Sequence, residues 1–379
     1  MEYVALKDVC KINMGQSPDS SSYNDKKEGI PFYQGNADFG EKHPIPRVWC
    51  NAPTKIAQPK DILMSVRAPI GALNYAQEKC CIGRGLAAIT PDKDKLSLEF
   101  LYWFLRGKNS ELNSKGTGST FKAISKKTLE EIRVPLIDLE KQQKMAQALE
   151  KTYSVIQMRT KQSKELDDLI KARFVEMFGD PETNSKGWAE ISLSEKLNVL
   201  GGYAFKSDQF EETGGIPVLR IGNINSGYFK PVNMVYWKED RSLERYAMYP
   251  GYLVMSLTGT VGKDDYGNVC ILGNAYEMYY LNQRNAKLEL KDGLDKYYLA
   301  ELLKFSQVKK KLTGISRGVR QANISNKDIL NLVAPIPPME LQQQFANFVE
   351  QIAKSKATVQ KALDETQLLF DSLMQQYFG

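Results

Sequence analysis

The chain has 379 residues, enough for two or three domains with cores of their own. Its 51 Lys and Arg against 45 Asp and Glu give a formal charge of +6, which suits a nucleic-acid partner but is also ordinary for a soluble protein. Five cysteines without a C-x-x-C pair and a single histidine argue against a disulfide framework, structural zinc and a multi-histidine metal site. No apolar run has the length of a membrane span, and the N-terminus lacks the apolar core of a signal peptide. We therefore expect a cytoplasmic protein without a membrane partner.

Residues 1–135 are predicted to form a strand-rich domain. Its short apolar stretches are rich in Ile, Leu, Val and Tyr and are separated by Gly, Pro, Asn and Asp, as in EGIPFY (28–33), DILMSVRAPIGA (61–72) and CIGRGLAAI (81–89). Such runs are typical of short β-strands joined by turns.

Residues 136–179 are predicted to form one long helix. Pro135 stops a strand just before the helical pattern, and Gly179 ends it. Positions that step by three and four residues form a narrow stripe, in which six of ten residues are apolar: Met145, Leu149, Thr152, Ile156, Arg159, Ser163, Leu166, Ile170, Arg173 and Met177. A stripe of this width predicts a coiled-coil seam that is too narrow to fill a globular core.

Residues 180–335 and 336–379 are predicted to repeat the same two elements. GGIPVL (214–219), YLVMSLTGTVGK (252–263) and LNQRNAKL (281–288) correspond to the three stretches of the first domain. In the second helix eight of ten seam positions are apolar: Phe345, Val349, Ile352, Lys356, Val359, Leu363, Thr366, Phe370, Leu373 and Tyr377. Two similar struts in one chain are natural partners for each other.

The internal repeat is clearest where each helix begins. VPLIDLEKQQKM (134–145) returns as APIPPMELQQQF (334–345), at an offset of 200 that holds for about sixty residues without a gap. We therefore predict an α+β fold with two strand-rich α/β domains. Two long helices forming an antiparallel coiled coil separate them, and the repeat gives a pseudo-twofold axis.

These motifs, in this order, resemble the DNA specificity subunits of type I restriction-modification systems. The resemblance covers the whole chain as target-recognition domain 1 (1–135), conserved helical spacer 1 (136–179), target-recognition domain 2 (180–335) and conserved helical spacer 2 (336–379). It also includes the junction FGDPETNSKGW (178–188). The second copy departs from the pattern where Thr258 replaces Arg67 and Asn285 replaces Gly85, as different DNA targets would require.

The resemblance implies a non-catalytic subunit that reads a bipartite, asymmetric site in double-stranded DNA. It further implies docking of two adenine-N6 methyltransferase subunits that use S-adenosylmethionine, and of restriction subunits that use ATP and magnesium. No cofactor is expected in this chain itself.

Candidate DNA contacts lie in or beside the Gly-rich loops. Arginine suits phosphates and the guanine edge, and Gln or Asn suits adenine. The candidates are Gln16, Gln34, Arg67, Arg84, Arg220, Asn223, Gln283, Arg284, Arg317, Arg320 and Gln321. Tyr33, Tyr203 and Phe205 are suited to packing on a sugar or a thymine methyl, although a place in the core is the more ordinary interpretation.

Two other functions remain open from the residues alone. The long helices also suit a coiled-coil adaptor for protein or RNA. Pro18-Asp19 and Asp25-Lys26-Lys27 imitate the metal site of a nuclease, but at a very short separation and in a turn-like polar stretch. The chain has no phosphate-binding loop, and Pro337-Pro338 lacks the flanking residues of an amino-methyltransferase motif. His43 fits a turn.

Overall fold

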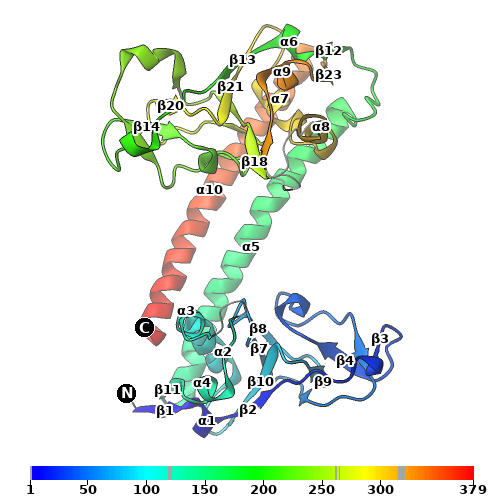
Figure 1. The fold of residues 1–379 in the computed structure, drawn as a ribbon, viewed down its shortest axis with the longest axis vertical. Helices are drawn as coiled ribbons and strands as arrows, with labels where there is room; N and C mark the ends of the chain where they lie inside the picture. The colour runs from blue at the N-terminus through cyan, green and yellow to red at the C-terminus, as the bar shows by residue number, and fades with distance from the viewer. Residues whose placement is uncertain (1, 118–121, 261–262, 264, 315–320) are drawn as a thin grey trace. The chain divides into compact units, whose positions relative to one another are not determined.

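The structure, a computed structural model, describes residues 2–117, 122–260, 263, 265–314 and 321–379 (Figure 1). The chain divides into two units that both contain parts of the long helices. Unit 1 comprises Met1–Lys161 and Gln360–Gly379, and unit 2 comprises Gln162–Val359. Among the described helices, none is both long and apolar enough to span a membrane.

Two sheets form most of unit 1. The first is antiparallel, in the order β2 (Cys10–Met14), β10 (Leu86–Pro91), β7 (Ile62–Ser65) and β8 (Leu73–Tyr75). The second has the order β3 (Tyr23–Asn24), β5 (Trp49–Cys50), β4 (Ile30–Tyr33), β9 (Cys80–Ile82) and β6 (Ile56–Ala57). In this second sheet β4 and β9 are parallel, which brings the ends of both strands to the same edge.

Short helices and a small sheet complete unit 1. They are β1 (Glu2–Ala5) paired with β11 (Arg133–Leu136), α1 (Leu6–Val9), α2 (Leu98–Gly107), α3 (Asn109–Ser114), α4 (Lys126–Glu130), η1 (Ser20–Ser22) and η2 (Asn36–Asp38). Ser97 caps α2 through the Phe100 amide, and the helix buries Phe100, Trp103 and Phe104 against the first sheet.

Unit 2 repeats this arrangement, as predicted. One four-stranded sheet has the order β13 (Leu197–Gly201), β21 (Asn285–Leu290), β17 (Leu253–Ser256) and β19 (Val269–Ile271). A second has the order β15 (Val235–Trp237), β14 (Ile216–Leu219), β20 (Tyr279–Leu281) and β16 (Ala247–Met248). Two further pairs are β12 (Glu190–Ser192) with β23 (Val333–Pro335), and β18 (Thr258–Thr260) with β22 (Gln321–Asn323). Its helices are α6 (Leu193–Lys196), α7 (Lys296–Leu302), α8 (Ser306–Thr313), α9 (Asn326–Leu330), η3 (Ser207–Gln209), η4 (Ile221–Asn223) and η5 (Arg241–Tyr246). The parallel pair β14–β20 matches β4–β9.

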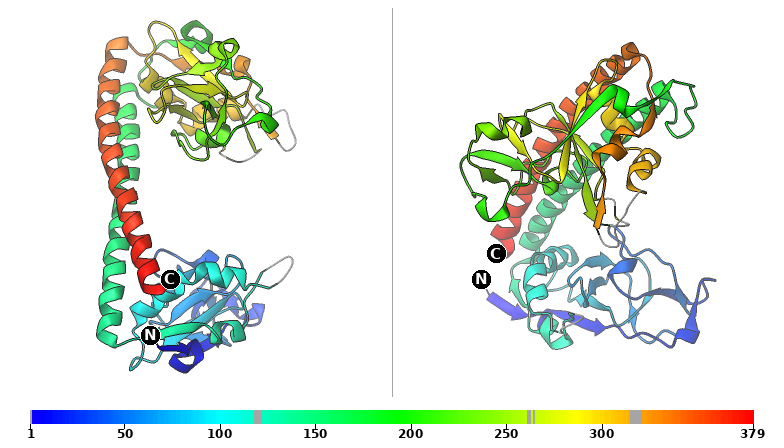
Figure 2. Two further views of the ribbon diagram at one scale, coloured as in Figure 1. Left: turned by 90° about the vertical axis from the view of Figure 1, so that its left-hand side faces the viewer. Right: turned by 45° about the horizontal axis from the view of Figure 1, so that its top comes forward.

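The long helices α5 (Leu139–Phe178) and α10 (Met339–Phe378) have 40 residues each and run antiparallel within each unit (Figure 2). Unit 1 pairs the first part of α5 with the last part of α10, and unit 2 pairs the reverse parts. None of the twenty predicted seam residues is exposed. The predicted seam is therefore confirmed.

The prediction that this stripe is too narrow for a globular core is wrong at the helix ends. In unit 1 the Phe370 ring lies 5.6 Å from Trp103, and the Phe378 ring 5.4 Å from Phe100. In unit 2 the Phe174 and Phe178 rings pack on other buried rings in the same way. These phenylalanines widen the stripe, so the last turns of each helix complete the core of a unit.

A buried glutamine fixes the start of α5. Gln142 has no exposed surface, and its Oε1 accepts a hydrogen bond from the Ser97 amide at 2.8 Å. Its Nε2 donates to the Lys95 and Ile137 carbonyls, both at 2.8 Å. This one side chain therefore ties the loop before α2 to the first turn of the long helix.

Gln342 repeats this device in unit 2. It too has no exposed surface, and its Oε1 accepts from the Asp295 amide at 2.8 Å. Its Nε2 donates to the Gly293 carbonyl at 3.2 Å and to the Pro337 carbonyl at 2.8 Å. The first glutamine of each Gln-Gln pair in the repeat thus connects a strand-rich domain to its long helix.

Candidate nucleic-acid interface

A tight turn joins β9 to β10 in unit 1. It is closed by a hydrogen bond from the Leu86 amide to the Gly83 carbonyl at 2.9 Å. A Cβ on Gly85 would lie 2.2 Å from the Gln34 carbonyl oxygen, so only glycine permits this close approach of the chain leaving β4. The turn and the end of β4 therefore form one rigid edge.

Four predicted contacts of unit 1 gather around this turn. The Gln16 amide donates to the Ile82 carbonyl at 3.0 Å, and the Gln34 amide donates to Asp38 Oδ2 at 2.7 Å. Arg84 is one of the two central residues of the turn, and Arg67 directly follows Val66, whose amide donates to the Gly85 carbonyl at 2.9 Å. The side chains of Gln16, Gln34, Arg67 and Arg84 are all exposed. A fixed backbone thus presents four polar side chains to solvent, as base readout requires.

Unit 2 has the equivalent turn between β20 and β21. The Asn285 amide donates to the Asn282 carbonyl at 2.9 Å, and the Gln283 amide donates to the Tyr203 carbonyl at 2.9 Å. Arg220, Gln283 and Arg284 line a hollow of about 620 Å³ beside this turn. The structure therefore brings these three predicted contacts together.

The sheet register corrects one predicted pairing between the two turns. Ser65 pairs with Leu86 in unit 1, and Ser256 pairs with Asn285 in unit 2. Asn285 is therefore the counterpart of Leu86, and the predicted match of Asn285 with Gly85 is wrong by one residue.

The geometry contradicts the predicted base contact of Asn223. Its side chain is 3% exposed, and its Oδ1 accepts from the Arg220 amide at 2.9 Å. Its Nδ2 donates to the Lys230 and Val232 carbonyls, both at 3.0 Å. Because the amide is buried and hydrogen-bonded at both ends, it shapes the loop and has no free edge for a base.

Three predicted contacts have side chains outside the described part of the structure: Arg317, Arg320 and Gln321. Arg317 and Arg320 are outside the described residues. The backbone of Gln321 pairs with Thr260 between β22 and β18, and its side chain is outside the description.

Of the aromatic candidates, two belong to the core. Tyr33 and Phe205 are 3% and 7% exposed, and burial raises the pKa of Tyr33 above its usual value. Tyr203 differs, because it is 38% exposed while its ring lies 4.9 Å from that of Phe205. Its ring also lies 5.4 Å from that of Tyr246, so Tyr203 is packed on the core and partly open to solvent.

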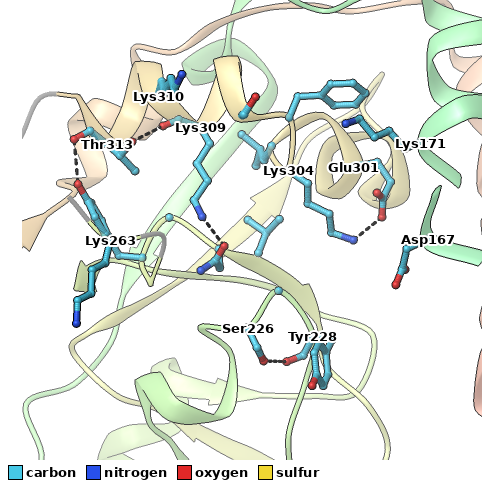
Figure 3. Close-up of a pocket in the computed structure, with 18 of the residues that line it drawn as sticks. Asp167, Lys171, Ser226, Tyr228, Lys263, Glu301, Lys304, Lys309, Lys310 and Thr313 are labelled. Atoms are coloured by element: carbon cyan, nitrogen blue, oxygen red, sulfur yellow. Dashed lines mark hydrogen bonds and ion pairs between the residues drawn. The ribbon is translucent and has the colours of Figure 1, made fainter. Parts of the chain in front are cut away.

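Lysines surround a second hollow of unit 2, of about 800 Å³, between α5, α7, α8 and neighbouring loops (Figure 3). Lys309 is only 7% exposed, and its Nζ donates to Asn268 Oδ1 at 2.6 Å. Lys304 pairs with Glu301, whereas Lys310 is exposed on α8. Asp167, Asp168 and Glu301 also line this hollow, so it carries charges of both signs. Of the run Lys309-Lys310-Lys311, Lys309 and Lys310 line the hollow.

Asp19, one residue of the nuclease alternative, has a structural role. Asp19 caps η1 by accepting hydrogen bonds from the Ser21 amide and hydroxyl, which hold the pKa of its carboxyl below the usual range. Within the described ranges, no three His, Cys, Asp or Glu side chains are grouped to hold a metal. His43 is exposed, with Nδ1 2.9 Å from the Tyr75 carbonyl oxygen.

The five cysteines are buried and free: Cys10, Cys50, Cys80, Cys81 and Cys270. Burial raises the pKa of Cys10, Cys80 and Cys270 to about 12. These three are therefore neutral thiols near pH 7, which are poor nucleophiles and poor metal ligands.

Several curated proteins are similar to this chain in sequence. It is 45% identical over 161 residues to the putative type I restriction enzyme MjaX specificity subunit of Methanocaldococcus jannaschii, over 42% of this chain and 38% of that relative. It is 27% identical over 288 residues to the MjaVIII specificity subunit of the same organism, over 69% and 67% of the two chains. The type I restriction enzyme EcoBI specificity subunit of Escherichia coli is 19% identical over 410 residues, with 98% and 83% covered. The chain thus spans about two fifths of the first relative and larger shares of the others.

Solved structures share the fold. The S subunit of a type I restriction-modification system from M. genitalium has a TM-score of 0.63 at 15% identity, with 100% of this chain and 96% of that chain covered. A chain from a structure titled for complex assembly and conformational transition of the type I R-M system has a TM-score of 0.51 at 17% identity, with 100% and 97% covered. These likenesses confirm the predicted α+β fold with paired long helices.

The family comparison covers almost the whole repeat. Residues 1–168 and 185–366 match the model described as type I restriction modification DNA specificity domain. This match confirms the prediction of a recognition component that is not itself an enzyme. The chain therefore belongs to the type I restriction-modification DNA specificity family.

Proposed function

We propose that this chain reads a bipartite, asymmetric site in double-stranded DNA for a type I restriction-modification complex. The observation that carries the proposal is the recurrence of one hydrogen-bonded turn in both units with different exposed side chains. In unit 1 the turn presents Arg84, and in unit 2 it presents Gln283 and Arg284. Because arginine and glutamine suit different bases, the two halves of the target should differ in sequence.

The proposal includes partner subunits in the cytoplasm. Two adenine-N6 methyltransferase subunits with S-adenosylmethionine would dock on the chain, and restriction subunits would supply ATP- and magnesium-dependent steps. The helices support two equivalent docking sites, because Leu169 on α5 and Leu369 on α10 are 200 positions apart and are 47% and 53% exposed. We infer that these two matching leucines belong to the surfaces that the partner subunits cover.

Exchange of one reader tests the proposed function. Replacing about residues 186–320 with the equivalent segment of another family member should change one half of the methylated site and preserve the other half. The reason is that the exchanged segment carries the turn of unit 2 and leaves that of unit 1 intact. Mapping of methylated adenines in cells that carry the chain and its methyltransferase measures the result. A change in both halves would contradict independent readers, and DNA binding without sequence preference would favour the adaptor alternative.

A second test addresses the two docking sites. Leu169→Glu and Leu369→Glu should each remove one bound methyltransferase, because a charge replaces an apolar contact that contributes roughly 1.5 to 3 kcal/mol. Titration with light scattering measures the stoichiometry, which should fall from two to one in each single variant and to zero in the double variant. Thr160→Glu and Gln360→Glu are matched controls, since these exposed residues lie about half a turn around each helix from the leucines. Two bound subunits in the double variant would place docking elsewhere.

A further inference from the structure

We propose that four structurally equivalent positions in each unit select the bases of its half-target, which adds Thr258 to the recognition surface and selects Tyr203 among the aromatic candidates. This inference rests on the proposed DNA-reading function and assigns it to particular residues. In unit 1 the four positions are Gln16, Gln34, Arg67 and Arg84, and in unit 2 they are Tyr203, Arg220, Thr258 and Gln283.

The turn itself gives the first equivalence. The Val66 amide donates to the Gly85 carbonyl at 2.9 Å, and the Leu257 amide donates to the Arg284 carbonyl at 2.8 Å. Arg284 therefore occupies the place of Gly85. It follows that Gln283, and not Arg284, is the counterpart of Arg84.

The strand before the turn gives the second equivalence. The Gln16 amide donates to the carbonyl of Ile82, the last residue of β9, at 3.0 Å. The Tyr203 amide donates to the carbonyl of Leu281, the last residue of β20, at 2.8 Å. Tyr203 therefore stands where unit 1 has Gln16, and its carbonyl accepts a hydrogen bond from the Gln283 amide at 2.9 Å.

The ends of the parallel strands give the third equivalence. Gln34 directly follows β4, and its amide donates to the capping side chain of Asp38 at 2.7 Å. Arg220 directly follows β14, and its amide donates to the capping side chain of Asn223 at 2.9 Å. Gln34 and Arg220 thus occupy one position, and the buried Asn223 is the counterpart of the cap Asp38.

The strand behind the turn gives the fourth equivalence. Arg67 lies two residues after Ser65 and pairs with Ala123, and Thr258 lies two residues after Ser256 and pairs with Asn323. The two pairing partners, Ala123 and Asn323, are 200 positions apart, which is the offset of the repeat.

The two units share the backbone of this site but differ in the side chains at the four positions. A Cβ on Gly15 would lie 2.1 Å from the Gly83 carbonyl oxygen, and a Cβ on Gly202 would lie 2.2 Å from the Asn282 carbonyl oxygen. Both units therefore keep glycine at this point of close backbone approach. By contrast, none of the four reading positions carries the same residue in both units. Two domains that recognise different DNA sequences need a similar backbone with different side chains at the contact positions.

The chemistry of the two sets differs accordingly. Unit 1 presents two arginines and two glutamines, which suit guanine and adenine. Unit 2 presents one arginine and one glutamine, and adds Tyr203 and Thr258, whose apolar atoms suit a thymine methyl. The second half-target should therefore contain a thymine contact that the first half-target lacks.

Reciprocal exchanges at equivalent positions test the inference in the intact chain with its methyltransferase. Arg84→Gln and Gln16→Tyr should each change the preferred base at one position of the first half-target, with a roughly 5- to 150-fold loss of discrimination at that base pair. Gln283→Arg and Tyr203→Gln should do the same in the second half-target. In every variant the other half-target should be unchanged. Methylation of a randomised DNA library, read by sequencing, measures all four.

Arg133→Gln is the matched control for Arg84→Gln. Arg133 is exposed on β11, and its Nη2 donates to the Tyr3 carbonyl at 2.6 Å, away from the turn. The control loses the same charge and should retain every base preference. Thermal unfolding of each variant checks folding, and Gln16→Tyr tests the same equivalence as Tyr203→Gln without removing a packed ring.

The outcomes separate the inference from the proposed function. A wild-type complex that methylates no defined sequence overturns both. A wild-type complex with a bipartite site, together with folded variants that keep all base preferences, overturns this inference alone. So does a preference that shifts in the opposite half-target or in Arg133→Gln.

Discussion

Gln342→Leu is expected to lower the free energy of unfolding of unit 2 by about 3 kcal/mol or more. Leucine fills a similar volume but leaves the Asp295 amide and the Gly293 and Pro337 carbonyls without the partner that Gln342 supplies. Each buried backbone group that loses its hydrogen bond costs roughly 1 to 3 kcal/mol. Urea denaturation followed by circular dichroism measures the change.

Gln343→Leu provides the control, because Gln343 is the exposed neighbour on the same helical turn. A surface substitution of this kind should change stability by no more than about 0.5 kcal/mol. Gln142→Leu should destabilise unit 1 as Gln342→Leu destabilises unit 2, since Gln142 makes the same three bonds. Equal small effects at positions 342 and 343 would show that the buried glutamine does not connect the domain to its helix.

The sequence predicted the long helices and their seam because the apolar period is a local property of the chain. A step of three and four residues places Leu149 and Ile170 on one face whatever surrounds them. It did not predict that Phe174 and Phe378, which lie next to seam positions, enter a domain core, because the partners of these rings are distant in sequence. Which face of a helix end is covered is decided by tertiary packing.

In the candidate site, too, local sequence patterns located the loops, whereas the role of single residues depended on tertiary contacts. The motifs located the correct loops, since glycines mark the places where backbones approach closely. Matching by residue likeness aligned Arg84 with Arg284, whereas the hydrogen bonds of the turn align Arg84 with Gln283. Asn223 was predicted as a contact from its residue type, but an amide serves equally well as an internal cap, and only burial distinguishes the two roles.

A fragment that ends at Gly179 is expected to form a symmetric dimer. In the whole chain, the last turns of α10 complete the core of unit 1 through Phe370 and Phe378. The fragment lacks these residues, which leaves Trp103 and Phe100 without their covering rings. Each phenylalanine side chain that would be buried there contributes roughly 2 to 3 kcal/mol. The two together contribute about 4 to 6 kcal/mol, a large part of the roughly 5 to 15 kcal/mol that stabilises an ordinary domain, so the monomer should be only marginally stable.

The repeat supplies a replacement from a second copy of the same fragment. The end of α5 carries Ile170, Phe174 and Phe178 at the positions that correspond, at the offset of 200, to Phe370, Met374 and Phe378. If the α5 ends of two copies exchange, each completes the other's core, and the pseudo-twofold relation becomes a true twofold axis. With its methyltransferase, such a dimer should methylate a palindrome built from the first half-target. Sedimentation at micromolar concentration measures the association, and Phe174→Asp with Phe178→Asp should abolish it because these rings lie in the exchanged end. A folded, helical monomer of the unsubstituted fragment would show that unit 1 does not need the end of a long helix in its core.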